Sequence, residues 1–525
     1  MKNVKRYDKR SFGWLIMLVV ITVASVLAYA LAYMHDFAGD DSIDFWQLLY
    51  GSVSQGVLSN MPEVIAGVLG ITVTVVAIVV ELASNRYTSR ITELFVTAPT
   101  NLVVLGFFVV TALLCIWVSL TGSSPGHVPH AGAVITTVAI TICLVALMPY
   151  FGFVFNFLNP HNIIDRMASS ALAAMTKGGR GEGVKSERCK EGAVRGIEQL
   201  ADVALNAIDN KDKVICMHAV NTLGRLMRDY FNFKESFSVG WFNMDSWIRE
   251  NPDFVSMQDE VLDDIEQGRY WLEMKILRQY QMLYGETLNR MRDINYLIAI
   301  NTRKAAQEAM DRNDEHSADL AVKFFNTYMR ATINSKDVRT AYNVLNQYRL
   351  LAENALTQGR NQVALDAARR FQYYGQLGFS AGLAFVLETA AYDLCTLNEL
   401  AFKLDADCKN ELLEIFLDVD KEAEEGHDLE ASLRGVRKAQ IKLATYYLIN
   451  GADDLARSIY EDMRDELPSR LISIREELDS ITSEGFWEVS DRGVNFDYLD
   501  PERRATLDTF FGWFSFGERP SDRLS

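Results

Sequence analysis

Long apolar runs dominate the first 158 residues of the chain. An α-helix needs about 20 apolar residues to cross a hydrocarbon layer about 30 Å thick, and four runs reach this length. A cleavable signal would have a shorter apolar core, whereas the first run continues without a cleavage site to His35. The predicted transmembrane helices are approximately residues 12–34, 62–82, 102–121 and 131–155.

After these spans the apolar positions recur at helical spacing, and alternation typical of strands is scarce. Gly359, Asp405 and Gly451 are turn-like positions 46 residues apart, each between two helical patterns. Such a period favours an α-solenoid, and the last helix pair resembles a tetratricopeptide hairpin. An irregular helical bundle is the alternative. The predicted helices of this region are residues 337–357, 361–374, 380–403, 408–424, 429–449 and 453–466.

The fold class predicted from these patterns is all-α, with four transmembrane helices followed by a large cytoplasmic α-helical domain of solenoid or TPR-like type. The predicted divisions are the transmembrane domain 1–160, an amphipathic segment with a Gly-rich linker 161–190, a helical domain 191–335, a repeat-like region 336–482 and a C-terminal cap 483–525.

Residues 176–190 are rich in glycine and charge and nearly spell a phosphate-binding loop. Val184, however, separates Gly183 from Lys185, and no strand precedes the segment to aim its amides. We therefore interpret it as a flexible linker.

Two segments of the second half are rich in aromatic residues, residues 231–247 and the tail from Phe486. In the tail, Asp500 before Pro501 is typical of a helix start. Because so many aromatic side chains would not stay in water, we expect the tail to fold back as a cap on the helical array, or else to dock onto a partner or another copy.

The distribution of charge sets the orientation of the spans. Lysine and arginine near span ends stay on the cytoplasmic side, and they occur before the first span, between the second and third, and after the fourth. The segments 35–61 and 122–130 contain neither residue. Both termini are thus expected in the cytoplasm, in a multi-pass membrane protein.

Composition separates the two halves further. Of the 52 Lys/Arg and 69 Asp/Glu residues, 7 and 8 lie within residues 1–158, so the later residues carry a net charge of −16. An acidic body repels phosphate backbones, which excludes a nucleic-acid partner. The six cysteines show no paired close spacing, and no disulfide or zinc framework is expected.

One face of the second predicted span is small or polar, while its other faces are Val, Ile and Leu. The small residues favour close helix packing. With several copies around an axis, the two glutamates would form carboxylate rings, so the stripe is also a candidate pore lining. The residues of this stripe are Glu63, Gly67, Gly70, Thr74, Ala77, Glu81, Ser84 and Thr88.

Signatures of catalysis and metal binding are absent from the sequence. It lacks the Gly-x-Ser-x-Gly and His-Glu-x-x-His motifs, and the acidic run from Asp418 has Ala423 where a calcium loop needs glycine. His127 and His130 have no assigned third ligand. We expect no catalytic residues, no cofactor and no metal.

A distinctive set of residues marks the end of the second span and the start of the third: Ala83, Ser84, Tyr87, Ser89, Arg90, Leu105, Gly106 and Phe108. These positions resemble a family of bacterial predicted membrane proteins, domain of unknown function 2254. The resemblance extends over about residues 50–230 and includes a helix-like stretch from Gly196, but the chain has Asp209-Asn-Lys-Asp where the family has a Pro/Gly turn. It implies four spans with a cytoplasmic extension, and no activity.

Two functional hypotheses follow for an integral protein of the bacterial inner membrane. The first is a non-enzymatic, homo-oligomeric scaffold or sensor with a cytoplasmic helical domain that binds a protein partner. The alternative is an ion channel or transport component lined by the second span.

Overall fold

A computed structural model describes residues 55–86, 90–122, 130–181, 183–420, 429–486, 488–489 and 491–514. The chain divides into two compact units, Met1–Arg166 and Met167–Ser525. Within the described ranges every regular element is a helix, and a single isolated β-bridge joins Gly485 to Val494. The predicted all-α class is confirmed at this level.

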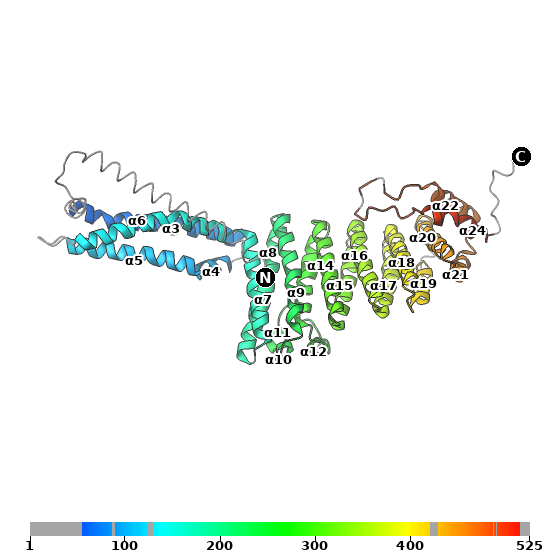
Figure 1. The fold of residues 1–525 in the computed structure, drawn as a ribbon, viewed down its shortest axis with the longest axis horizontal. Coiled ribbons are helices and arrows are strands. Elements are labelled where there is room, and N and C mark those ends of the chain that lie inside the picture. Colours follow the sequence, from blue (N-terminus) through cyan, green and yellow to red (C-terminus); the bar gives the residue numbers. More distant parts are fainter. Residues whose placement is uncertain are drawn as a thin grey trace. The chain divides into compact units, whose positions relative to one another are not determined.

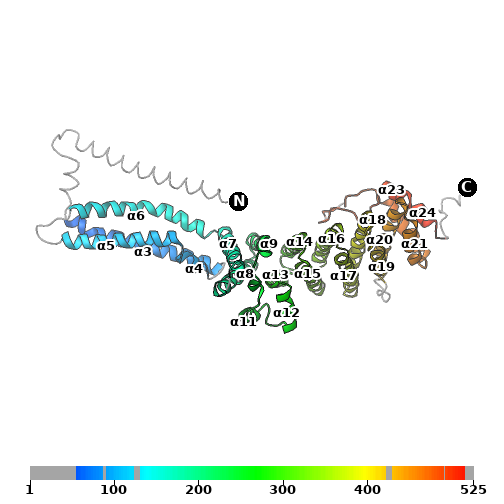
Figure 2. The same ribbon diagram turned by 60° about the horizontal axis from the view of Figure 1, so that its bottom comes forward.

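The first unit contains three helices long and apolar enough to cross a membrane, Asn60–Ser84, Pro99–Thr121 and Ala131–Phe157. They confirm three of the four predicted spans, and the predicted span at residues 12–34 lies outside the described residues. The helices lie side by side (Figure 2). The elements of this unit are α3 (Gln55–Arg86), α4 (Arg90–Val96), α5 (Pro99–Gly122) and α6 (His130–Phe157).

A small core of Ile65, Phe108, Cys115 and Cys143 holds α3, α5 and α6 together. Most other apolar side chains of these helices point outward, as Trp117 does with 62% of its surface exposed. Outward apolar side chains suit a lipid environment, because lipid tails solvate them as well as a protein core would. This packing fits helices that span a bilayer.

The second unit is a series of antiparallel helices (Figure 1). It begins with the later part of α7 (Pro160–Gly179). Its helices are α8 (Val184–Asp209), α9 (Lys213–Lys234), α10 (Val239–Phe242), α11 (Ser246–Arg249), α12 (Asp259–Gln267), α13 (Trp271–Thr287), α14 (Arg292–Asp311), α15 (Glu315–Asn334), α16 (Val338–Thr357), α17 (Asn361–Ser380), α18 (Ala384–Lys403), α19 (Lys409–Leu417), α20 (Leu429–Ile449), α21 (Asp453–Met463), α22 (Pro468–Ser480), α23 (Pro501–Ala505) and α24 (Leu507–Phe511).

The long helices from α8 to α20 stack in two layers, which we call the helical array (Figures 1 and 2). In one layer α9, α14, α16, α18 and α20 pack in succession, and in the other α8, α13, α15, α17 and α19 do. Each helix also packs on its chain neighbour in the opposite layer. The array therefore buries its apolar faces between successive hairpins.

The turns of the array repeat at nearly constant spacing. Seven described turns from the end of α13 onward each contain one residue with positive φ, a left-handed conformation that closes a helix C-terminus. From the first to the sixth of these turns the intervals are 24, 23, 23, 23 and 23 residues, and the next interval of 46 spans two periods. These residues are Asn289, Asn313, Lys336, Gly359, Gly382, Asp405 and Gly451.

Aspartates following such turns start the next helix. The side chains of Asp212, Asp314 and Asp337 accept hydrogen bonds from the backbone N–H groups three residues later, at 3.1–3.3 Å. A capping carboxylate satisfies an amide that has no partner inside the helix. Short turns thus end one helix and begin the next.

The array corrects some predicted helix limits. Helix α17 continues past the predicted end at residue 374 to Ser380, and Gly382 forms a turn where the prediction began the next helix. Helix α19 ends at Leu417 rather than 424. The predicted period of 46 residues counted helix pairs, and it agrees with the structure, where each helix with its turn takes about 23 residues.

The predicted flexible linker at residues 176–190 is mostly helical: α7 extends to Gly179 and α8 begins at Val184. Its glycines serve close packing. A Cβ atom at Gly178 would lie 2.5 Å from Cζ3 of Trp241, and one at Gly179 would overlap the Phe237 ring. The linker interpretation was wrong because glycine allows close approach as well as flexibility.

Replacing Gly178 by alanine is expected to lower the free energy of unfolding by about 1–3 kcal/mol, because the added methyl group overlaps Trp241. The matched control is Gly240→Ala, where a Cβ would meet nothing within 4 Å. Thermal unfolding of both full-length variants, followed by circular dichroism, measures the difference. Equal melting temperatures would contradict this packing.

The C-terminal segment folds back onto the array. Helices α22, α23 and α24 all pack on α20. Asp500 caps α23 at its predicted start, accepting from the Arg503 amide at 2.9 Å. The aromatic residues Phe510, Phe511 and Phe514 are buried, and the Phe514 ring lies 4.8 Å from that of Tyr460.

Candidate functional site

The predicted small and polar stripe of α3 lies on the outer surface of the described membrane helices. A Cβ atom added at Gly67 or at Gly70 would meet nothing within 4 Å among the described residues, so no described residue covers either glycine. Six of the eight stripe residues are exposed, Ser84 is half-buried and Thr88 lies outside the described residues; the exposed ones are Glu63, Gly67, Gly70, Thr74, Ala77 and Glu81.

A different face of α3 contacts α5 and α6. It carries Ile65, which is fully buried, together with Val68 and Leu69. Within the described spans the stripe is therefore not the packing seam. Its two predicted roles, a packing seam and a pore lining, would require contacts with other segments or other copies of the chain, and both stay predictions.

The family-like positions fall into three groups. Tyr87 and Ser89 lie outside the described residues, and the side chain of Arg90 is not described. Ala83 and Ser84 are half-buried at the end of α3. On α5, Phe108 is buried in the core, Leu105 is half-buried and Gly106 is exposed.

A polar link between α5 and α6 was not anticipated. The Tyr150 hydroxyl donates to the Asn101 side-chain oxygen at 2.7 Å, and both residues are buried. Asn101 opens the family-like stretch of the third span. A hydrogen bond between spans satisfies polar groups that the hydrocarbon layer cannot solvate.

In the part of the chain that the structure describes, no group of three or more His, Cys, Asp or Glu residues is arranged to hold a metal ion. His316 stacks on Tyr270 with ring centroids 5.9 Å apart. His127 and the predicted calcium-like position Ala423 lie outside the described residues.

The most elaborate polar site lies where an extended C-terminal segment crosses the array. We call residues 491–499 the strap, and the faces of α16, α18 and α20 that it touches the groove. The Arg492 guanidinium inserts between rings, 4.3 Å from the centroid of Tyr342 and 5.4 Å from that of Phe496. It pairs with Asp393 and donates to the Tyr342 carbonyl at 2.8 Å. Only 5% of the Arg492 side chain is exposed.

The following strap residues engage α18 and α20. Phe496 stacks on Tyr392 with centroids 4.7 Å apart and planes 14° from parallel. The Asp497 carboxylate accepts from the Tyr392 hydroxyl and, at 2.8 Å, from Lys438 Nζ. These contacts fix the side chains of Phe496 and Asp497.

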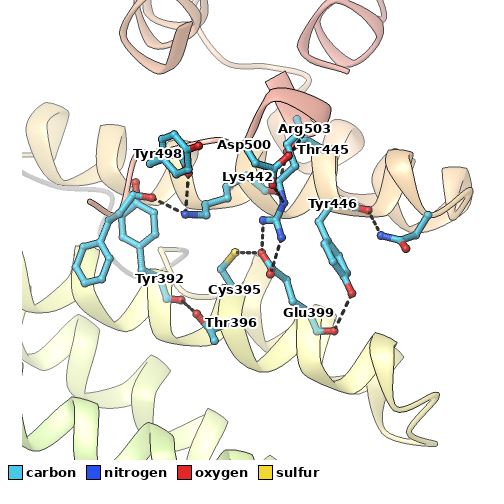
Figure 3. A network of polar contacts seen from close by, with 12 residues as sticks. Tyr392, Cys395, Thr396, Glu399, Lys442, Thr445, Tyr446, Tyr498, Asp500 and Arg503 are labelled. Carbon is cyan, nitrogen blue, oxygen red and sulfur yellow. Dashed lines mark hydrogen bonds and ion pairs between the residues drawn. The ribbon is translucent and has the colours of Figure 1, made fainter. Parts of the chain in front are cut away.

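Lys442 of α20 binds the strap backbone (Figure 3). Its Nζ donates to the carbonyls of Phe496 at 2.8 Å and Tyr498 at 3.1 Å. Burial lowers the pKa of Lys442. Two carbonyl acceptors suit an ammonium that lies this deep, because they solvate it in place of water.

Next to Lys442, Arg503 binds both oxygens of Glu399 at 2.7 and 2.9 Å (Figure 3). The Cys395 thiol lies 3.6 Å from the same carboxylate. Burial, reinforced by the charge of Glu399, raises the pKa of Cys395. A thiol held protonated is a poor nucleophile, so this network anchors the cap rather than offering a reactive cysteine.

Glu388 gives the groove a pH dependence. Burial, with the nearby Asp497 charge, raises the pKa of Glu388 from 4.5 to about 7, against the effect of Lys438. The folded state therefore binds a proton that the unfolded state releases, and stability falls as pH rises from about 4.5 to about 7, by up to about 3 kcal/mol.

We expect Glu388→Gln, which mimics the protonated form, to raise the melting temperature at pH values above about 7 and to leave it unchanged near the ordinary carboxyl pKa of about 4.5. Glu414→Gln, an exposed position on α19, is the matched control. Melting curves at both pH values measure the effect. If Glu388→Gln raised the melting temperature equally at both pH values, the proposed role of Glu388 would be contradicted.

Neither the strap nor the groove was predicted from the sequence. The aromatic tail was expected to form one cap, whereas the recognition residues include the charged side chains Arg492 and Asp497 and their partners on the helices. The local signal was an Asp-Arg-Gly turn at residues 491–493 inside an otherwise aromatic segment.

Comparison with known families addresses the first part of the chain. Residues 10–195 match the family model described as Predicted membrane protein (DUF2254). This part of the chain is similar to the DUF2254 family. The DUF2254 match covers all four predicted spans and ends within α8. It begins earlier than the predicted resemblance at residues 50–230 and stops before the helix-like stretch from Gly196.

No curated protein and no solved structure matches the chain. Most of the helical array lies beyond the DUF2254 match. Its role is therefore argued from its own surfaces and contacts.

Proposed function

We propose that the protein is a non-enzymatic scaffold or sensor in the bacterial inner membrane whose helical array binds a protein partner on the cytoplasmic side. The observation that carries this proposal is the two-layered stacking of helices at a near-constant period. Solenoid architectures of this kind present long continuous faces, and recognition of extended or helical protein segments is their usual role.

The negative charge of the array favours a protein as its partner. A net charge of −16 beyond residue 158 disfavours contact with anionic lipid headgroups and with nucleic acid. A protein partner suits such a surface better. The DUF2254-like region then serves as the bilayer anchor, with both chain ends in the cytoplasm.

Photo-cross-linking in intact cells tests the scaffold proposal. A photoreactive phenylalanine analogue at Phe385 of α18 or Tyr373 of α17, exposed by 42% and 40%, probes the two layers of the array. Trp117 in the membrane unit is the control position. We expect a discrete adduct with one other protein from at least one array position and not from Trp117. Absence of adducts at both array positions would contradict the proposal.

Homo-oligomerisation is the second part of the proposal, supported by the open stripe of α3. Small residues allow close contact between helices, and nothing described covers Gly67 or Gly70. Native mass spectrometry should show an oligomer that Gly67→Leu with Gly70→Leu dissociates, while Ile71→Leu, on an exposed apolar position, leaves it intact. A monomeric wild-type protein would contradict this part.

The same stripe favours a pore as the alternative function. Glu63 and Glu81 are both exposed on it. Ion flux into liposomes that contain the purified protein separates the two functions. The scaffold proposal expects no flux, whereas a cation current weakened by Glu63→Gln or Glu81→Gln would establish the pore.

A further inference from the structure

We propose that the groove on α16, α18 and α20 is a docking site for an extended segment of the partner protein, and that the strap occupies this site until the partner displaces it. This inference rests on the proposed scaffold function and gives it a site. The strap shows which chemistry the groove accepts.

The groove offers three recognition features for side chains. A buried Asp393 beside the Tyr342 ring accepts an arginine, and the Tyr392 ring accepts an aromatic side chain. The Tyr392 hydroxyl and Lys438 bind a carboxylate. The occupant is therefore an extended segment with the pattern of the strap, an arginine followed four residues later by an aromatic and then an acidic residue.

Lys442 adds a feature that does not depend on sequence. Its two bonds to the strap go to main-chain carbonyls, so they would form with any extended backbone in the same position. Contacts to carbonyls supply affinity, while side-chain pockets supply specificity, as in other modes of extended-peptide recognition.

Two charged residues of the groove keep partners when the strap leaves. Asp393 also pairs with Arg349 of α16 at 3.2 Å, and Lys438 also pairs with Glu477 of α22 at 2.8 Å. Removing one partner of a buried ion pair is most costly when the other charge is left alone. Here release of Arg492 and Asp497 leaves neither facing charge alone.

The strap buries fewer apolar side chains than the cap that follows it. Within residues 491–499 only Leu499 is fully buried, and Asp491, Gly493 and Val494 are exposed. The cap instead buries the side chains of Leu507, Phe510, Phe511 and Phe514. The strap can therefore leave the groove while the cap stays in place.

The tethering of the strap favours a partner protein over a second copy. Helices α22 and α23, which flank the strap, both pack on α20 of the same chain. A strap from another copy is held at both ends in the same way, and it could enter this groove only by dismantling its own cap. A partner segment without these tethers has no such requirement.

The test uses full-length protein in nanodiscs and a fluorescent peptide with the sequence of residues 491–500. The double variant Arg492→Ala/Phe496→Ala releases the strap, and Arg464→Ala, an arginine 60% exposed at the end of α21, is the control. We expect the peptide, followed by fluorescence anisotropy, to bind the double variant at least tenfold more tightly than the wild type or the control. A peptide with alanine at both positions should not bind.

Arg492→Lys is measured in parallel because it keeps the charge and disturbs the fold less, and it should give intermediate binding. The proposal is overturned if the peptide fails to bind variants that melt like the wild type, or if it binds wild type and variants equally. If the double variant dimerised by exchanging straps between copies, the occupant of the groove would be a second copy of the chain rather than a partner protein. If binding fails while cross-links from Tyr373 persist, the scaffold function survives and only the site is wrong.

Discussion

Replacing Lys234 by methionine is expected to destabilise the array by about 3–5 kcal/mol. The Lys234 ammonium lies 2.5 Å from both Glu273 and Asp314, and the Glu273 side chain is fully buried. Its Oε2 atom has no hydrogen-bond partner among the described residues. Methionine would therefore leave a buried carboxylate without its counter-ion where α9, α13 and the start of α15 meet.

Chemical denaturation of the full-length protein, followed by circular dichroism, measures this loss. Lys213→Met is the matched control, because Lys213 and Asp293 form an exposed pair worth at most about 1 kcal/mol. Adding Glu273→Gln to Lys234→Met removes the stranded charge and should recover most of the stability. A Lys234→Met variant as stable as Lys213→Met would show that this ion pair does not hold the array.

Truncating Trp241 to alanine is expected to cost about 3–5 kcal/mol as well, through loss of packing rather than charge. The side chain is fully buried, with Phe237 and Trp271 rings 5.6 Å away. Its Nε1 donates to the Tyr230 hydroxyl at 3.2 Å. Alanine would leave a cavity and remove the donor.

The control for Trp241 is Val239→Ala, two residues away and 66% exposed, which should change stability little. Denaturation curves of both variants provide the comparison. Similar midpoints would mean that the aromatic segment at residues 231–247 is peripheral to the array, contrary to the described packing.

The sequence predicted the helices of this protein better than their contacts. Apolar length alone placed the three described spans, since a bilayer imposes about 20 residues on any helix that crosses it. Helical spacing also placed α16, α18 and α20 closely. The turn at Gly382 was not placed, since the helix predicted at residues 380–403 runs through it.

Glycine and charge patterns gave wrong or incomplete predictions where tertiary contacts decide. Gly178 indicated a linker, although the nearby Trp241 ring is the reason for its small size. The role of Arg492 was not predicted because its partners, Asp393 and Tyr342, lie about 100 and 150 residues earlier in the chain. Pairing over such separations is not visible in a pattern of neighbours.

The scaffold, the groove and the proposed orientation all require that the array face the cytoplasm. The described native cysteines are buried except Cys189, which is half-buried, so a single exposed cysteine can report the side of the membrane. Val214→Cys on α9, where the native side chain is 64% exposed, places one on the array. Asp40→Cys places one in the predicted outer loop.

Labelling spheroplasts with a membrane-impermeant maleimide therefore tests the central claim most directly. We predict that Asp40→Cys reacts in intact spheroplasts and that Val214→Cys reacts only after the membrane is permeabilised. Rapid labelling of Val214→Cys in intact spheroplasts would place the array outside the cytoplasm and contradict the account.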